Sequence, residues 1–211
     1  MIEKTKGIQL TKRDMEIIRF INEFGFCEMP QIERQFGIKK PLSYRLVRRL
    51  IRAGLIIHQR IFHSTYGIYY VTAQGAKCTD LPPLGTISLG RYEHQQAVTN
   101  VFIQLQRKYP DTNWISERRL KHEKYFQGVG KKGHLSDGML VFSDGKQIAI
   151  EIELSLKGKE RINRILKSYG TTFSINEVWY FCPKGMIAAL SALAAKLSFV
   201  KIYNLEEVLH E

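Results

Sequence analysis

The sequence has few of the residues that stabilise disulfide-rich or zinc-binding proteins. Only three cysteines occur in 211 residues, at positions 27, 78 and 182. Their odd number and wide spacing provide neither a disulfide framework nor the paired ligands of a structural zinc site, so a reducing cytoplasm is the expected location. The six histidines show no H-x-H or H-E-x-x-H spacing, which argues against a zinc enzyme.

Long apolar runs are also absent from the sequence. No stretch approaches about 18 consecutive apolar residues, so we expect no transmembrane helix and no membrane partner. The opening residues, MIEKTKGIQLTKRD, lack the apolar centre of a secretory signal. Because 44% of the residues are hydrophobic, the chain can bury the core of one large or two small domains.

Acidic residues are outnumbered by basic ones. The chain has 32 Lys and Arg against 20 Asp and Glu, which gives a formal charge of +12. Residues 1–75 hold 13 of the basic and only 6 of the acidic side chains. Such a balance favours a polyanionic partner, nucleic acid before membrane, and the N-terminal third is the expected electrostatic anchor.

The first 79 residues have the pattern of a winged-helix DNA-binding domain. Thr11 and Asp14 form a near-capping-box pattern at the start of a helix expected over residues 12–24. Pro30 suits the first turn of a second helix over 30–36, and a third helix follows within 39–53. Residues 55–71 contain two β-rich runs around a Ser-Thr-Tyr-Gly turn, typical of a hairpin. Three helices followed by a hairpin is the order of a winged helix.

The third helix is expected to recognise DNA. Its apolar residues recur at helical spacing, while most of its arginines fall off that stripe. A cationic face of this kind suits a groove lined by phosphates, although an ordinary solvated basic helix has the same pattern. The DNA contacts expected from this helix and the residues before it are Lys39, Lys40, Ser43, Tyr44, Arg45, Arg48, Arg49 and Arg52. The hairpin would add Arg60, His63 and Tyr66.

Residues 80–90, DLPPLGTISLG, are rich in proline and glycine and predict a linker. The second domain is then expected over residues 91–211. A helix over 91–108 precedes strands at 114–119, 138–142 and 147–154, with a basic loop over 121–135. A helix over 158–169, a strand over 177–182, a helix over 185–196, a strand over 199–203 and a short helix over 205–210 follow. The predicted order α-β-β-β-α-β-α-β makes the whole chain a mixed α/β (α+β) protein.

Carboxylates are the chemically suggestive residues of the second domain. Glu151 and Glu153, two apart on a strand, point to one face, and Asp137 opens the neighbouring strand. Three carboxylates at one sheet edge favour a bound Mg²⁺ or Mn²⁺, which could generate hydroxide for phosphodiester hydrolysis. His134 and Lys157 lie close to these carboxylates in the sequence. The alternative is a half-exposed strand whose glutamates simply form its polar outer face.

The same segment resembles the core of PD-(D/E)xK nucleases. Asp137 and Glu151 match the two acidic positions, with Glu93 as a possible helical acid. The resemblance implies metal ligation by Asp137 and Glu151. Glu153 stands where the family has its lysine, so Lys157 or Lys159 would have to replace that lysine from the following loop. Without such a replacement, the resemblance implies a site that binds metal or is inactive.

The order of segments over residues 10–209 resembles the replication-relaxation family of plasmid and mobile-element proteins. The resemblance is carried by LTKRDMEIIRFI, YRLVRRLIRAGLI, GIYYVTAQGAK, RYEHQQAVTNVFIQL, LSDGMLVF, IAIEIELSLKG and NEVWYFCPKG. It implies a DNA-binding half joined to a nuclease-like half, and a role in plasmid replication, DNA relaxation or mobilisation. Double-stranded DNA is the implied partner, with other replication or mobilisation proteins and a second copy of the chain as further candidates.

Three functions remain open from the sequence. The first is a DNA-binding protein of a mobile element. The second is a metal-dependent nuclease or nickase that uses Asp137 and Glu151, and the third is a winged-helix transcriptional regulator. The Tyr69–Tyr70 pair also raises a relaxase-type tyrosine nucleophile, although packing of a tyrosine-rich strand explains the same residues.

Overall fold

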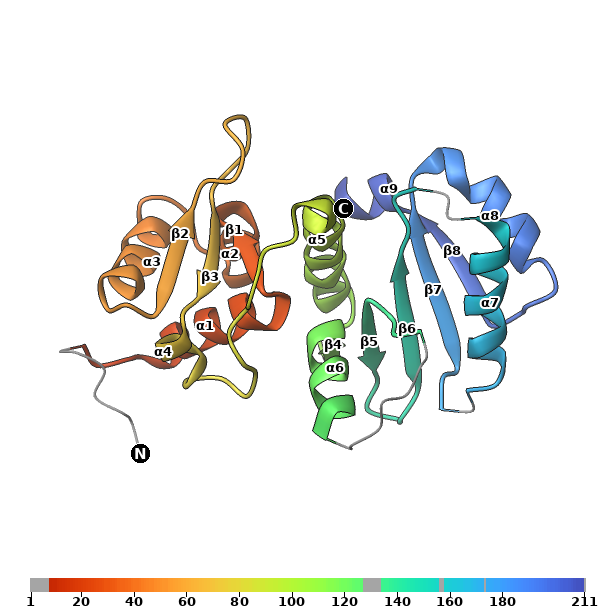
Figure 1. Ribbon diagram of the computed structural model, residues 1–211, viewed down its shortest axis with the longest axis horizontal. Coiled ribbons are helices and arrows are strands. Elements are labelled where there is room, and N and C mark those ends of the chain that lie inside the picture. Colours follow the sequence, from red (N-terminus) through yellow and green to blue (C-terminus); the bar gives the residue numbers. More distant parts are fainter. Residues whose placement is uncertain (1–7, 127–133, 156–157, 173, 211) are drawn as a thin grey trace. The chain divides into compact units, whose positions relative to one another are not determined.

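The computed structural model describes residues 8–126, 134–155, 158–172 and 174–210. The chain divides into two compact units, Met1–Tyr92 and Glu93–Glu211. Each unit has its own β-sheet, so the protein is a mixed α/β structure with two sheets (Figure 1). None of the helices in the described ranges is both long enough and apolar enough to cross a membrane.

The first unit consists of helices packed on a small antiparallel sheet. Its elements are α1 (Lys12–Phe24), β1 (Phe26–Glu28), α2 (Met29–Phe36), α3 (Leu42–Arg52), β2 (Ile56–Gln59), β3 (Ile68–Val71) and α4 (Ala73–Ala76). The strand order is β1-β3-β2, and both pairings are antiparallel. The three predicted helices and the hairpin are confirmed, whereas β1 and α4 were not predicted.

Helix α1 shows how local sequence sets an element boundary. The Thr11 side chain accepts a hydrogen bond from the Asp14 backbone N–H at 3.2 Å, and the Asp14 carboxylate accepts one from the Thr11 N–H at 2.8 Å. This reciprocal capping box satisfies two N–H groups that have no partner inside the helix. Ile17, Ile18 and Ile21 are fully buried, so they form the apolar face of α1.

The segment predicted as a linker lies against the first unit. The Asn22 side chain donates a hydrogen bond to the Leu81 carbonyl at 2.8 Å. Leu84 and Ile87 pack against a buried cluster that includes Phe26 and Tyr92. A short 3₁₀ turn, η1 (Leu89–Arg91), then leads into the next helix. Residues 81–91 are therefore part of the first unit's structure.

The second unit contains a five-stranded mixed sheet. Its elements are α5 (Tyr92–Lys108), β4 (Asn113–Ser116), α6 (Glu117–Phe126), β5 (Gly138–Val141), β6 (Gln147–Ile152), α7 (Lys159–Gly170), β7 (Glu177–Cys182), η2 (Lys184–Met186), α8 (Ile187–Ala194), β8 (Val200–Asn204) and α9 (Leu205–His210). The strand order is β4-β5-β6-β7-β8. Strands β4, β5 and β6 pair antiparallel, and β6, β7 and β8 pair parallel.

One prediction for this unit was wrong. The strand expected over 114–119 ends at Ser116, and α6 follows it, so residues 121–126 are helical where a loop was expected. The Ser116 hydroxyl accepts a hydrogen bond from the Arg119 N–H at 3.1 Å, and Lys121 pairs with Glu117 one helical turn away at 2.6 Å. These local contacts favour a helix. The rest of the predicted loop, residues 127–133, lies outside the described residues.

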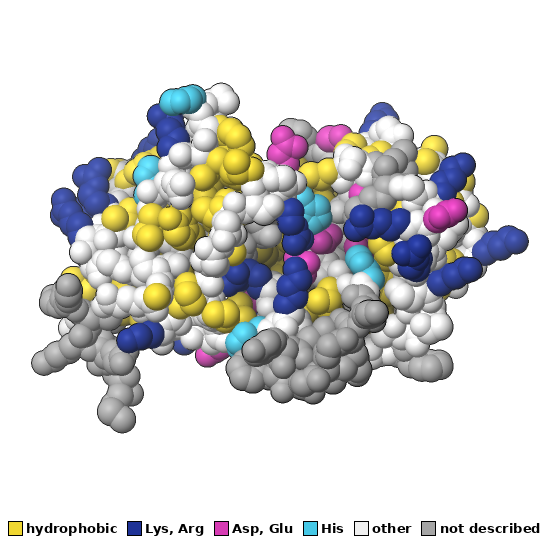
Figure 2. All heavy atoms as spheres, viewed as in Figure 1, with side chains coloured by type: hydrophobic (Ala, Val, Ile, Leu, Met, Phe, Trp, Pro, Cys, Tyr) yellow, Lys and Arg dark blue, Asp and Glu magenta, His cyan; other side chains and the backbone are white. Residues whose placement is uncertain are grey.

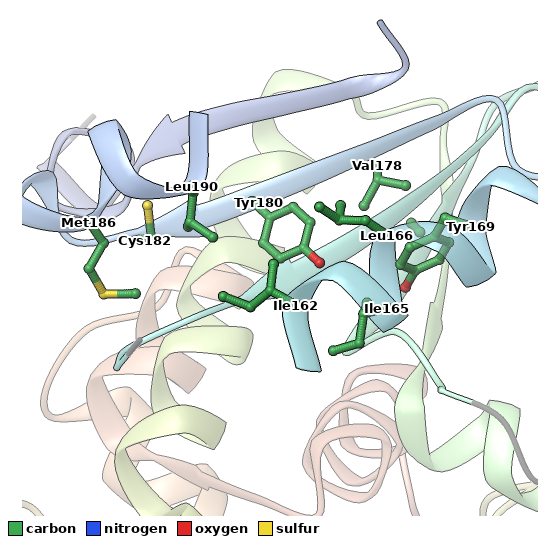
Figure 3. Close-up of a cluster of buried hydrophobic side chains, with 10 residues drawn as sticks. Ile162, Ile165, Leu166, Tyr169, Val178, Tyr180, Cys182, Met186 and Leu190 are labelled. Atoms are coloured by element: carbon green, nitrogen blue, oxygen red, sulfur yellow. The ribbon is translucent and has the colours of Figure 1, made fainter. Parts of the chain in front are cut away.

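Alternating residues of β7 face two different layers. Val178, Tyr180 and Cys182 join a buried cluster with side chains of α7 and α8 (Figure 3). Trp179 faces the opposite side, where its ring lies 5.8 Å from that of Tyr109, just after α5. The sheet is thus covered on both faces, which explains why β6 and β7 are buried along almost their whole length.

Candidate nucleic-acid interface and carboxylate cluster

Helix α3 separates its apolar and cationic residues cleanly. Val47 and Leu50 are buried, whereas Arg45, Arg48 and Arg52 are exposed. The three arginines are spaced three and four residues apart, so they share one side of the helix. The core therefore holds one side of α3 and leaves a row of guanidinium groups in solvent.

A groove of about 820 Å³ runs beside these arginines. It is lined by Ile8, Pro41, Leu42, Tyr44, Arg45, Leu46, Arg48, Arg49, Arg52 and Ala53. Lys39 and Lys40 are exposed just before the helix, and the Lys40 ammonium lies 4.9 Å from the Tyr44 ring centre. Lys and Arg side chains gather over this part of the first unit (Figure 2, left edge). We call Lys39, Lys40, Tyr44, Arg45, Arg48 and Arg52 the α3 face.

Two residues predicted to contact DNA have structural roles instead. Ser43 is completely buried, and its hydroxyl donates a hydrogen bond to Glu33 at 2.5 Å. Arg49 forms an ion pair with Asp14, whose side chain is fully buried in α1. Burial raises the pKa of Asp14, but hydrogen bonds from Thr11 and Arg49 outweigh this effect and lower it overall. Both residues fix the position of α3, and Ser43 has no surface to offer a ligand.

The loop between β2 and β3 borders a second hollow of about 500 Å³. We call it the hairpin hollow; it is lined by Met29, Tyr44, His58, Arg60, His63, Ser64, Thr65, Tyr66, Gly67 and Tyr69. Arg60, His63 and Tyr66 are exposed, as a role in ligand contact requires. His58 was not predicted, because nothing in its sequence surroundings distinguishes it from any strand residue.

Tyr69 has the properties of a packing residue. Its side chain is buried, and its ring stacks on that of His58 with centres 4.7 Å apart. Burial, followed by the charges of Tyr44 and Glu33, raises the pKa of Tyr69 to about 12. A nucleophilic tyrosine needs the opposite shift or a nearby base, so the structure favours packing for Tyr69.

In the second unit, the strand register brings three polar side chains into one row across the sheet. Gly138 pairs with Ile150, which puts the preceding residue, Asp137, beside Glu151. Glu151 in turn pairs with Tyr180 on β7. Cross-strand neighbours share a face, so Asp137, Glu151 and Tyr180 lie side by side. We call these three residues the carboxylate row.

Asp137 is held at the start of β5 by two donors. Its Oδ2 accepts a hydrogen bond from the Ile152 N–H at 2.8 Å and lies 3.2 Å from His94 Nε2. His94 Nε2 is also 3.1 Å from the Ile152 carbonyl oxygen, which can only accept, so this nitrogen carries a proton. Glu93, the helical acid that the nuclease resemblance implies, is exposed. Its neighbour His94 is the α5 residue that reaches Asp137.

Glu151 is buried and contacts two side chains. His134 Nε2 lies 2.6 Å from its Oε1, and the Tyr169 hydroxyl from α7 donates to the same oxygen. Burial raises the pKa of Glu151, and the nearby Asp137 adds to that effect, while hydrogen bonds from His134 and Tyr169 oppose it; the net shift is upward. His134, three residues before Asp137 in the sequence, thus contacts Glu151.

Glu153 lies one residue beyond the end of β6. Its N–H donates to the Phe181 carbonyl at 3.0 Å, and its side chain is 4% exposed, as is that of Glu151. The alternative of a half-exposed strand with an outer glutamate face was therefore wrong, because α7 and α8 cover this face. Lys157, the proposed lysine replacement, lies outside the described residues, and Lys159 is exposed at the start of α7.

Tyr180 completes the row without a hydrogen bond of its own. Its side chain is 3% exposed, and its hydroxyl has no partner among the described residues. Burial and then the charges of Glu151, Glu153 and Asp137 raise the pKa of Tyr180 well above its ordinary value. Figure 3 shows Tyr169 and Tyr180 within one cluster, from α7 and β7 respectively. Neither tyrosine was predicted, because their apolar neighbours suggest only core packing.

The carboxylate row does not by itself form a metal site. Among the described residues, no three His, Cys, Asp or Glu side chains gather in a way that could hold a metal ion. One oxygen each of Asp137 and Glu151 is engaged with a histidine. The chemistry of two adjacent carboxylates suits Mg²⁺, but an octahedral ion needs further oxygen ligands, from water or substrate.

Comparison with known proteins gives no relative: no protein-family model matches the chain, and no curated protein or solved structure matches it either.

Proposed function

We propose that this protein binds duplex DNA through the α3 face of its first unit. The observation that carries the proposal is the exposure of Arg45, Arg48 and Arg52 on one side of a helix whose other side is fixed in the core. Guanidinium groups bind phosphate oxygens in pairs and remain charged at every physiological pH. A rigid helix that presents three of them on one side can contact several backbone phosphates at once.

The architecture of the first unit supports this proposal. The order α1-β1-α2-α3-β2-β3, with an antiparallel sheet, is compatible with a winged helix, a fold whose third helix enters the major groove. The first unit carries 15 Lys and Arg against 7 Asp and Glu. Together with the resemblance to replication-relaxation proteins, these features support a role in replication, relaxation or mobilisation of a plasmid or mobile element.

Fluorescence anisotropy with a labelled duplex from the DNA that flanks the coding region tests the proposal. The triple variant Arg45→Ala, Arg48→Ala and Arg52→Ala should bind at least about tenfold more weakly at fixed salt, because it loses phosphate contacts. Arg19→Ala is the matched control, since Arg19 is an exposed arginine of α1 that lines neither the groove beside α3 nor the hairpin hollow. Equal affinities for the triple variant and the wild type would refute the proposal that the α3 face binds DNA.

A second candidate function is DNA cleavage by the second unit. The observation that favours it is the carboxylate row, which lies where β5 and β6 meet in a sheet of mixed direction between α5 and α7. This order of strands and helices supports the resemblance to PD-(D/E)xK nucleases. A bound Mg²⁺ or Mn²⁺, held by Asp137 and Glu151, would supply Lewis-acid activation of water. Glu153 cannot supply the positive charge of the lysine it replaces.

Incubation with supercoiled plasmid and Mg²⁺ or Mn²⁺ tests this candidate. Nicked or linear product that disappears with EDTA and in Asp137→Asn would establish a nuclease. Asp144→Asn, a change at an exposed turn between β5 and β6, is the matched control. Absence of cleavage by a preparation that still binds the duplex would leave DNA binding as the function and the carboxylate row as a structural feature.

A further inference from the structure

The hairpin hollow combines cationic and neutral hydrogen-bond donors. Arg60 contributes a guanidinium group, His58 and His63 contribute imidazoles, and Ser64 and Tyr44 contribute hydroxyls. No acidic residue is among the described side chains that line it. A concave surface with several donors and no carboxylate suits an anion with several acceptor oxygens, such as a phosphate.

His58 is held in place before any ligand binds. It pairs across the hairpin with Tyr69, and their rings stack with centres 4.7 Å apart. The backbone of Gly67 passes so close that a Cβ atom there would lie 2.1 Å from His58 Nε2. Glycine is therefore needed at position 67 for the imidazole to keep this position. A ring fixed in advance loses little conformational freedom on binding, which favours affinity.

We propose that the hairpin hollow binds one backbone phosphate of the DNA and that His58 and His63 take up a proton when it does. This proposal rests on the DNA-binding function proposed above and adds a second, pH-dependent contact to it. Histidine is the side chain that changes charge between about pH 5 and 8, and an adjacent phosphate favours the protonated imidazole.

The groups around the two histidines determine the direction of the effect. The Arg60 guanidinium lines the same hollow, and a bound phosphate would bring a negative charge beside it and beside the imidazoles. Tyr44, Tyr66 and Tyr69 also line the hollow. Lys40 lies over the outer ring of Tyr44, and Glu33, the nearby acid of α2, accepts a hydrogen bond from Ser43. Binding should therefore tighten as the pH falls.

Affinity for one labelled duplex at pH 8 and pH 6, at constant ionic strength, tests the proposal. Wild-type protein should bind about tenfold more tightly at pH 6, the change that a pKa shift of about one unit produces. The double variant His58→Gln and His63→Gln should lose this pH dependence. Gly67→Ala should also lose most of it with both histidines present, because the new methyl group displaces His58. His122→Gln, at a histidine of the second unit, is the matched control and should keep it.

Inorganic phosphate as competitor, at constant ionic strength, distinguishes a general phosphate site from one that needs the duplex. Stronger competition against the wild type than against the double variant would indicate a general phosphate site, whereas no competition against either, with the pH effect retained, would indicate a site that needs the duplex. Equal pH dependence in the wild type and the double variant would overturn the proposal for the hairpin hollow alone. The proposal that the α3 face binds DNA would still stand. Failure to bind the duplex at either pH would overturn both proposals.

Discussion

The two units of this protein use charged side chains in opposite ways. In the first unit, Arg45, Arg48 and Arg52 extend from α3 into solvent. In the second unit, Glu151 and Glu153 are 4% exposed, and Glu151 is hydrogen-bonded to His134 and Tyr169. Exposed cations can bind an anion from outside the protein. Buried carboxylates instead take their hydrogen-bond donors from the protein itself.

This contrast distinguishes exposed charges, which are free to bind an external anion, from paired charges that stabilise the fold. Arg48 and Arg49 are adjacent in sequence, yet Arg48 is exposed and Arg49 is paired with the buried Asp14. A basic residue on a helix is therefore not a candidate phosphate contact by default. Variants at these positions distinguish an effect on folding stability from an effect on DNA affinity.

The largest effect is expected at the Asp14–Arg49 ion pair. Arg49→Ala should lower the free energy of unfolding of the first unit by about 2–3 kcal/mol, because it leaves a buried carboxylate without its cation. Chemical denaturation followed by circular dichroism measures this loss. Arg48→Ala, one residue away, is the control and should change stability by less than about 0.5 kcal/mol. Similar losses in the two variants would contradict the assignment of separate roles.

The same ion pair gives a pH dependence with a defined sign. The pKa of Asp14 is lowered below its ordinary value of 3.8, so its ionised form stabilises the folded protein. That contribution is complete above pH 3.8 and is lost as the pH falls through the lowered value. The stability difference between wild type and Arg49→Ala should therefore shrink below that pH. A difference that stays constant down to full acid unfolding would contradict the pairing.

A smaller effect is expected beside the carboxylate row, where its member Tyr180 and the α7 residue Tyr169 are both buried tyrosines and form a matched pair. Tyr169→Phe removes a hydrogen bond to Glu151 and should destabilise the second unit by about 1–2 kcal/mol. Tyr180→Phe removes a buried hydroxyl that has no partner among the described residues, so it should be neutral or stabilising. Urea unfolding of both variants distinguishes the two cases. A loss at Tyr180 as large as at Tyr169 would show that its hydroxyl is bonded after all.

Most elements were predictable because their signals are local. The capping box at Thr11 and Asp14 gave the start of α1, and the apolar spacing of α3 and the β-rich run of β7 gave those elements. Strand β1 was missed because a strand of three residues is too short to show a periodic pattern. Helix α6 was missed because it is strongly polar and lacks a clear apolar stripe.

The candidate sites were predictable in part. The exposed arginines of α3 follow from periodicity, since they fall off the apolar stripe. The burial of Ser43 depends on Glu33, ten residues earlier, and the partners of Asp137 and Glu151 come from α5, α7 and the segment before β5. Such contacts join residues far apart in sequence, so helix and strand periodicity carries no signal for them.

The salt dependence of DNA affinity tests directly whether the α3 face binds DNA phosphates. Counterion release predicts that log K for the wild type falls linearly with log salt concentration, with a slope of about −3.6 to −5.4 if roughly four to six phosphates are contacted. Removal of Arg45, Arg48 and Arg52 should flatten the slope by about 2–3. A wild-type slope near zero, or the same slope in the triple variant, would contradict the claim that the α3 face binds the DNA backbone.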